Sequence, residues 1–143
     1  MTALKHWAFL LIPILFFSQC SSKLATIATD NSSGETSTDF NTALEAADNN
    51  LETKEGEQYD VSFGLSAGPW LMKALVQCSK GLDREDLVPF TVLVRVGKSG
   101  KAEEVLVRPG TKVAQCLKPE FAAANHPKPP GPSWWVKMVI EIR

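Results

Sequence analysis

The chain has 143 residues, of which 44% are hydrophobic and 22% are charged, and its formal net charge is −1. This length suits one domain of about 100 residues with accessory segments, and the composition excludes a collagen-like repeat and a fully disordered chain. The near-neutral charge argues against nucleic acid as a partner, because nucleic-acid-binding proteins usually carry a basic excess.

Charge is distributed unevenly and divides the chain into three parts. Residues 1–20 carry only Lys5, and residues 21–60 have two lysines against nine acidic residues. Residues 61–143 have a net charge of +5. Such differences are typical of segments with separate roles joined end to end.

The first part has the pattern of an export signal. A short positive N-terminus is followed by an apolar run, Trp7–Phe17, which is shorter than the roughly 20 residues that span a bilayer. Pro13 within the run argues against the alternative of a buried core helix. We therefore expect residues 1–20 to be a signal peptide.

The residues that follow this run resemble a bacterial lipoprotein box. Phe17-Ser18-Gln19-Cys20 places a cysteine where that family carries its lipid, although Phe17 and Gln19 differ from the residues usual there. The resemblance implies lipidation of Cys20 and, because no aspartate follows it, sorting to the outer membrane. The alternative is an ordinary signal peptide cleaved nearby, for example after Ala28.

Residues 21–58 are expected to form a flexible acidic tether. The segment is rich in Ser, Thr, Asn, Asp and Glu, and it has few large apolar side chains that could offset the entropy lost on folding. Thr42–Leu51 can form a transient helix, which Asn49 and Asn50 weaken. A coil of this length holds its ends roughly 35 Å apart on average.

Residues 59–143 are expected to form one small folded domain. Tyr59–Leu65 alternates apolar and polar residues, which indicates a short strand. Pro69 then favours the start of a helix, because proline is tolerated at the first helical position. We expect this helix to cover Trp70–Lys80 and to end at Gly81.

Two strands and a tight loop follow the helix. Phe90–Val96 and Glu103–Arg108 alternate side chains between two faces, as strands do. The loop Gly97–Lys101 contains two glycines that can supply the positive φ values of a tight return. These segments predict an antiparallel hairpin.

A second helix and a final strand complete the domain. Thr111 is a suitable N-cap for a helix that Pro119 is expected to end or kink, so that Glu120–Ala124 forms a separate turn. Trp134–Ile142 alternates as a strand. The sequence thus predicts an α+β fold in the order (strand)–helix–strand–strand–helix–strand. Its antiparallel sheet has three strands, or four if the first segment joins it, with two helices on one face.

The order and alternation of these segments resemble the TonB C-terminal domain and its relatives in bacterial envelope proteins. The resemblance begins near Pro69 and rests on the helix Trp70–Lys80, the hairpin Thr91–Val107, a helix with a central cysteine, a proline-bearing turn and a hydrophobic last strand. It implies that a partner peptide binds along Trp134–Ile142 as an added strand. The long membrane helix and proline-rich segment of the energy transducer are not seen in this sequence, so we expect the fold without that coupling role.

Three cysteines leave an odd thiol in an exported protein unless Cys20 is lipidated or removed. Cys78 and Cys116 then remain, each on the apolar side of one of two helices expected to share a sheet face. A disulfide between them is geometrically reasonable and should stabilise the fold by roughly 3–4 kcal/mol in the chain-entropy model. The alternative is two buried free thiols.

The sequence contains no recognisable catalytic or metal-binding motif. Of the two histidines, His6 lies in the export signal and His126 in an expected loop, whereas zinc requires clustered Cys and His. Asp83, Glu85 and Asp86 are better explained as a solvated turn than as paired catalytic carboxylates. We expect no enzymatic activity, no metal and no cofactor.

Binding is the function that the sequence favours. The strand pattern places five side chains on the sheet face away from the helices, where a partner could contact them: Leu93, Leu106, Trp135, Lys137 and Val139. The alternative is that neighbouring side chains or the first strand partly cover them. We expect a lipid-anchored envelope protein facing the periplasm, whose partner is another envelope protein, its extended peptide segment, or a second copy of the chain.

A peptidoglycan- or polysaccharide-binding lipoprotein is the competing hypothesis. In that case Trp135 would stack on sugars, and the positive charge of the last part of the chain would attract anionic polymers. Sedimentation with purified peptidoglycan would favour this hypothesis, and capture of a protein partner would favour the first.

Overall fold

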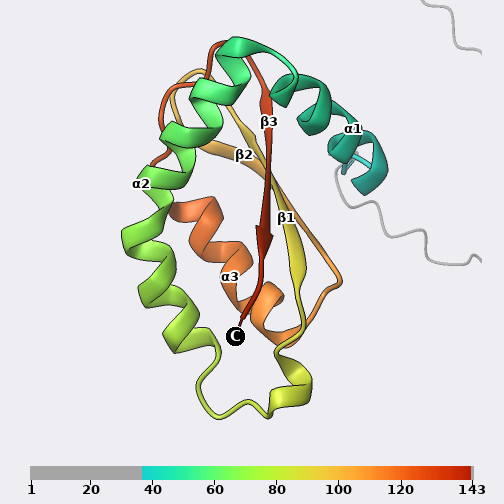
Figure 1. Ribbon diagram of the computed structural model, residues 1–143, viewed down its shortest axis with the longest axis vertical. Helices are drawn as coiled ribbons and strands as arrows, with labels where there is room; N and C mark the ends of the chain where they lie inside the picture. Colours follow the sequence, from blue (N-terminus) through green and yellow to red (C-terminus); the bar gives the residue numbers. More distant parts are fainter. Residues whose placement is uncertain (1–36, 143) are drawn as a thin grey trace, which may run out of the picture. The chain divides into compact units, whose positions relative to one another are not determined.

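The computed structural model describes residues 37–142, so the expected signal peptide, Cys20 and residues 21–36 of the expected tether lie outside the described residues. In chain order, the described part forms α1 (Phe40–Leu51), α2 (Lys54–Cys78), the short 3₁₀ helix η1 (Arg84–Asp86), β1 (Phe90–Val96), β2 (Ala102–Arg108), α3 (Lys112–Ala123) and β3 (Trp134–Ile140). The predicted α+β fold with a three-stranded antiparallel sheet is confirmed (Figure 1).

The sheet has the strand order β2–β1–β3, so β1 is central and β3 is an edge strand. β1 pairs antiparallel with both neighbours, and Leu93 lies opposite Leu106 on one side and Lys137 on the other. Of the two loop glycines, only Gly100 has a positive φ, 80°, which favours glycine at this tight return. The predicted hairpin and final strand are confirmed.

Helices cover both faces of the sheet. α2 and α3 pack on one face, over a core in which Phe63 and Phe121 are fully buried. α1 packs on the opposite face, where Ala43 and Ala47 form a second buried cluster with Trp135. Two helices on one face were predicted, and the third helix on the other face was not (Figure 1).

The segment Tyr59–Leu65, predicted to be a strand, lies inside α2. Its apolar residues belong to two sides of one helix, because Tyr59 and Phe63 are buried whereas Val61 and Leu65 are 62% and 76% exposed. Residues four apart share a helix face, and residues two apart do not. The prediction of a fourth strand is therefore wrong.

Both prolines that were expected to mark a helix boundary lie inside a helix. Pro69 is within α2 and Pro119 within α3, and both are exposed. A proline on the solvent side removes one helical hydrogen bond, while buried residues on the other side, such as Leu117 and Phe121, still pack the helix against the core. The predictions of a helix start at Pro69 and of a separate turn at Glu120–Ala124 are wrong.

The observed caps explain where the helices begin and end. The side chain of Thr53 accepts a hydrogen bond from the Gly56 N–H at the start of α2, and the side chain of Thr111 accepts one from Ala114 at the start of α3, as predicted. α2 ends at Cys78, and the predicted terminator Gly81 follows with a φ of 73°.

α1 occupies part of the segment that was expected to be a tether. The side chain of Asp39 accepts hydrogen bonds from the first backbone N–H groups of the helix. Ala43 and Ala47 are 0% and 3% exposed, because small side chains let the helix approach the sheet closely. The prediction of a flexible tether is therefore wrong for residues 37–58, where two helices are packed.

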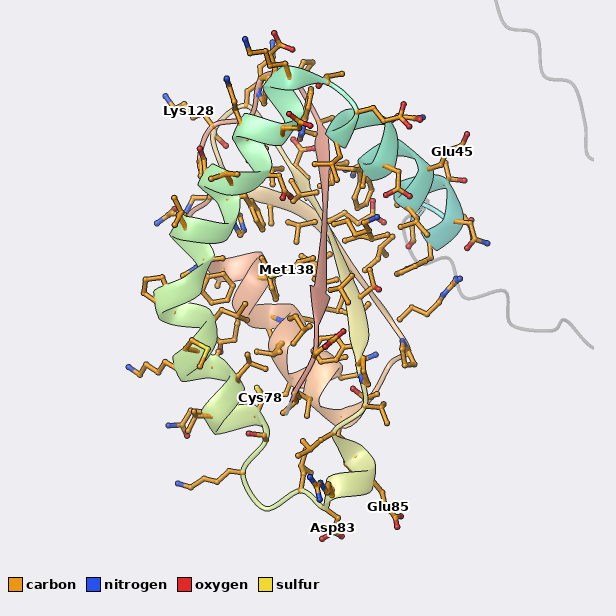
Figure 2. All side chains as sticks on the ribbon, in the orientation of Figure 1. Glu45, Cys78, Asp83, Glu85, Lys128 and Met138 are labelled. Atoms are coloured by element: carbon orange, nitrogen blue, oxygen red, sulfur yellow. A yellow bond between two sulfur atoms is a disulfide. The ribbon has the colours of Figure 1, made fainter. Side chains whose placement is uncertain are left out.

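The predicted disulfide between Cys78 and Cys116 is confirmed. The two sulfur atoms are 2.01 Å apart and the two Cα atoms 5.7 Å apart. The bond joins the end of α2 to the middle of α3 (Figure 2). It therefore closes a loop that contains the whole β1–β2 hairpin.

Candidate partner-binding site

α1 covers most of the surface that was predicted to bind a partner. Leu93 is fully buried and Trp135 is only 7% exposed, in a cluster with Ala43 and Ala47. Leu106 is partly buried against the same cluster. These three residues do lie on the sheet face opposite α2 and α3, but the prediction that they form an open docking surface is wrong.

Burial also removes the aromatic residue on which the sugar-binding hypothesis rested. The guanidinium of Arg95 lies 5.6 Å from the ring centroid of Trp135, and α1 packs against the same residue. The neighbouring Trp134 faces the other core, with its ring 6.3 Å from that of Tyr59 in an edge-to-face arrangement. Trp135 therefore presents no open ring face of the kind that stacks on a sugar, and Trp134 is partly buried against the other core.

The other two predicted residues lie further along β3. Lys137 is partly buried, and its ammonium group pairs with the carboxylate of Asp48 on α1. Val139 is 58% exposed. The side-chain surface that remains open is therefore the end of β3 around Val139, past the Lys137–Asp48 pair.

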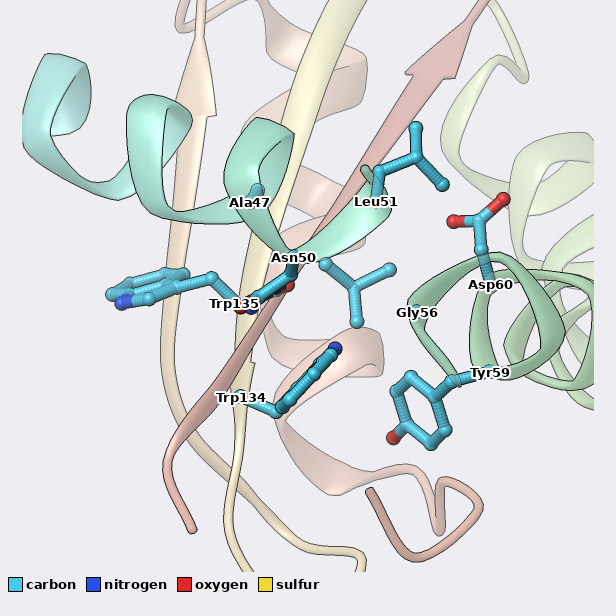
Figure 3. Close-up of a pocket in the computed structure, with 9 residues that line it drawn as sticks. Ala47, Asn50, Leu51, Gly56, Tyr59, Asp60, Trp134 and Trp135 are labelled. Carbon is cyan, nitrogen blue, oxygen red and sulfur yellow. Dashed lines mark hydrogen bonds between the residues drawn. The ribbon is translucent and has the colours of Figure 1, made fainter. Parts of the chain in front are cut away.

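The last turn of α1 closes the first half of the β3 edge. The side-chain amide of Asn50 donates a hydrogen bond to the backbone carbonyl of Trp135, with a distance of 3.0 Å. Leu51, Gly56 and Tyr59 surround this contact (Figure 3). Because Asn50 takes the position that a neighbouring strand would occupy, an added strand cannot pair with Trp135.

Beyond Asn50, the backbone of the β3 edge is unpaired. In an antiparallel strand, alternate residues direct both their N–H and C=O groups to one side, and the carbonyl of Trp135 is directed away from β1. Lys137 and Val139 are in phase with Trp135, so their N–H and C=O groups point the same way. Within residues 37–142, no helix or loop forms a hydrogen bond with these groups.

Glu104 on β2 holds the segment before α1 in place. Its carboxylate accepts hydrogen bonds from the backbone N–H and hydroxyl of Thr38, at 2.8 and 2.9 Å, and pairs with Arg95. Burial alone would raise the pKa of Glu104, but the Thr38 hydrogen bonds and the charge of Arg95 outweigh it and lower the pKa. The carboxylate is therefore charged at neutral pH and anchors α1 over the sheet.

Sequence reasoning missed the residues that shape this edge. Asn50 was interpreted only as weakening a helix, and Asp48 and Glu104 were given no role. Their partners are 85, 89 and 66 residues away in sequence. No local pattern indicates contacts at such a separation.

His126 is a buried polar residue in the loop after α3. It is 8% exposed, its ring stacks on Phe63 with centroids 4.8 Å apart, and its Nε2 lies 2.9 Å from the carbonyl oxygen of Phe121. Burial lowers its pKa, the hydrogen bond to Phe121 opposes this, and the charge of Lys101 lowers the pKa further. The neutral ring therefore serves packing.

We expect the stability of the fold to depend on pH through His126. Its pKa is about 6.5 in the unfolded chain and lower in the folded one, so the unfolded chain takes up a proton first on acidification. The stabilisation is complete above about pH 6.5 and is lost as the pH falls through the folded pKa. Urea unfolding from about pH 7.5 to 5 should show this loss. A His126→Gln variant should lack this component of the pH dependence, and an unchanged slope would contradict the assignment.

Two broader properties bear on the kind of site. None of the helices within residues 37–142 is long and apolar enough to cross a membrane. The described side chains also contain no group of three or more His, Cys, Asp or Glu residues placed to hold a metal ion. No protein-family model, curated protein or solved structure matches this chain. The candidate site rests instead on the geometry of the β3 edge, whose outward backbone groups beyond Trp135 are unpaired within the described residues.

Proposed function

We propose that this chain is a non-enzymatic cell-envelope protein that binds an extended peptide segment of a partner protein along the open edge of β3. The peptide adds a strand to the sheet, so its backbone forms hydrogen bonds with Lys137 and Val139. The single observation that carries the proposal is that β3 is an edge strand whose outward backbone groups at Lys137 and Val139 form no hydrogen bond with a described element.

The proposed site is suited to a short peptide. Asn50 occupies the edge at Trp135, so pairing begins at Lys137 and continues toward the end of β3. The exposed side chain of Val139 lies on the α1 face of the sheet and can contact an apolar side chain of the peptide. Backbone pairing supplies affinity here, and contact with Val139 supplies selectivity.

Two further properties support a place in the envelope. The disulfide Cys78–Cys116 is typical of proteins that fold in an oxidising compartment. The order α2–β1–β2–α3–β3, with β3 at an edge, is consistent with the resemblance to the TonB C-terminal domain. We therefore retain, as part of the proposal, export by the N-terminal signal and an outer-membrane lipid anchor at Cys20.

A proline at position 139 tests the proposal directly. Val139→Pro removes an N–H group that points away from β1, so the ladder between β1 and β3 keeps its hydrogen bonds. The full-length chain should capture its partner from solubilised envelopes of the source organism. Val139→Pro should reduce that capture about tenfold, because the variant loses one edge hydrogen bond and its ring blocks the approach of the added strand.

Val139→Thr is the matched control, because it keeps the N–H group and a β-branched side chain. It should capture the partner nearly as well as the unchanged chain. Thermal unfolding and an intact Cys78–Cys116 bond show that each variant is folded. Equal capture by the proline and threonine variants would rule out strand addition at this edge.

A further inference from the structure

α2 has a second apolar face that the fold does not use. Its buried residues lie on one side, toward the sheet and α3. Four exposed apolar side chains lie on the opposite side, at helical spacing, with exposures of 62%, 76%, 64% and 62%: Val61, Leu65, Met72 and Val76. Figure 1 shows α2 along one long side of the molecule, with no other described element outside it. We call these four residues the outer stripe.

The outer stripe is symmetric about its centre. Val61 and Val76 are equally far from the Gly68–Pro69 bond, and Leu65 and Met72 are too. A second copy of α2 running antiparallel therefore places Val61 opposite Val76 and Leu65 opposite Met72. A surface that is complementary to itself in this way is the requirement for a two-fold interface.

The glycines of α2 provide an independent indication of a close neighbour. Gly64 and Gly68 lie in the interior of the helix, where glycine lowers helix stability relative to alanine. A Cβ atom added at either position would meet nothing within 4 Å, so packing within the monomer does not require them. Gly68 lies midway along the outer stripe and on its flank, where the lack of a side chain would let a second helix approach closely.

Charges at the two ends of α2 also favour the antiparallel arrangement. The first turn carries Glu55 and Glu57, and the chain just after the helix carries the exposed Lys80. In an antiparallel pair, the acidic end of one copy lies beside the basic end of the other. The opposed helix dipoles favour the same orientation.

We propose that two copies of this chain form an antiparallel dimer through the outer stripe of α2. The outer stripe is about 22 Å long, so two antiparallel helices can bury it in one continuous interface. The interface would lie near the lower end of the range for specific pairs, about 1,200 Å² in total. The open β3 edge stays free for a different partner.

Photo-crosslinking in living cells tests the dimer with the full-length chain. A photoreactive phenylalanine derivative replaces Met72 in the chain expressed in a bacterial host. We expect a crosslinked homodimer whose linked peptide contains Leu65 of the second copy. The same derivative in place of Ser99, an exposed residue of the β1–β2 loop, should give no homodimer.

Two matched lysine variants then locate the interface. Leu65→Lys places a charge in the proposed dimer interface and should reduce crosslinking at position 72 about tenfold or more. Val139→Lys, at an exposed apolar residue of similar size on β3, should leave it unchanged. Both positions are exposed in the monomer, so thermal unfolding of both variants should match that of the unchanged chain.

Several outcomes would overturn the proposal. They are the absence of a homodimer, a link between position 72 and the same region of the second copy, and crosslinking that survives Leu65→Lys. Loss of crosslinking in Val139→Lys alone would assign the pairing to the β3 edge instead. The first three outcomes leave capture of a peptide partner untouched. Pairing at the β3 edge would instead make a second copy compete with the peptide, so capture measured with Val139→Pro distinguishes the failure of the two proposals.

Discussion

Replacing Cys78 and Cys116 together by alanine should lower the free energy of unfolding by about 4 kcal/mol in the chain-entropy model. The disulfide joins residues 38 positions apart and so restricts a long loop of the unfolded chain. That loop contains β1, β2 and half of α3, which are the centre of the fold. Without the bond, the helix pair α2–α3 is held only by packing.

Urea unfolding of the folded, oxidised protein measures this effect. The double variant should unfold at a lower urea midpoint than the unchanged chain under non-reducing conditions. Under a reducing agent, the unchanged chain should approach the behaviour of the double variant. A loss smaller than about 1 kcal/mol would mean that the bond adds little to packing between α2 and α3.

Trp135→Ala should destabilise the fold by about 3–5 kcal/mol, the range for truncating a buried large aromatic residue. The ring is 7% exposed and belongs to the cluster that attaches α1 to the sheet. Its loss opens a cavity beneath Ala43 and Ala47 and removes the contact with Arg95. Release of α1 would also expose Leu93, which is fully buried.

Val139→Ala is the comparison for this variant. Val139 is on the same strand and face as Trp135 but 58% exposed, so its truncation should change stability by less than about 0.5 kcal/mol. Chemical unfolding of the two variants measures the contrast, and hydrogen exchange of the α1 amides shows whether that helix is released. A stable Trp135→Ala protein that loses its partner would contradict the burial and restore the docking surface.

Local sequence patterns were sufficient to predict the hairpin, the last strand and the helix cap at Thr111, and the number and placement of the cysteines favoured the disulfide over two free thiols. The alternation of Phe90–Val96 and Trp134–Ile142 is a local pattern with period two, and the buried faces of those strands follow it. The pairing of Cys78 with Cys116 followed from their places on two helices that share a sheet face. Short-range stereochemistry is sufficient for the strands and the cap, whereas the disulfide also required the expected packing of two helices on one sheet face.

Other features of the fold follow from contacts between segments far apart in the chain. Tyr59–Leu65 fits a strand by its alternation and a helix by the burial of Tyr59 and Phe63, and the core formed with α3 selects the helix. α1 looks polar because its buried residues are small alanines, and it is stabilised by contacts with Leu93 and Trp135 far along the chain. Part of the β3 edge stays open because Asn50 forms its hydrogen bond only with the first half of the strand. Such features depend on which distant segments contact each other, and a local pattern of side chains does not indicate those contacts.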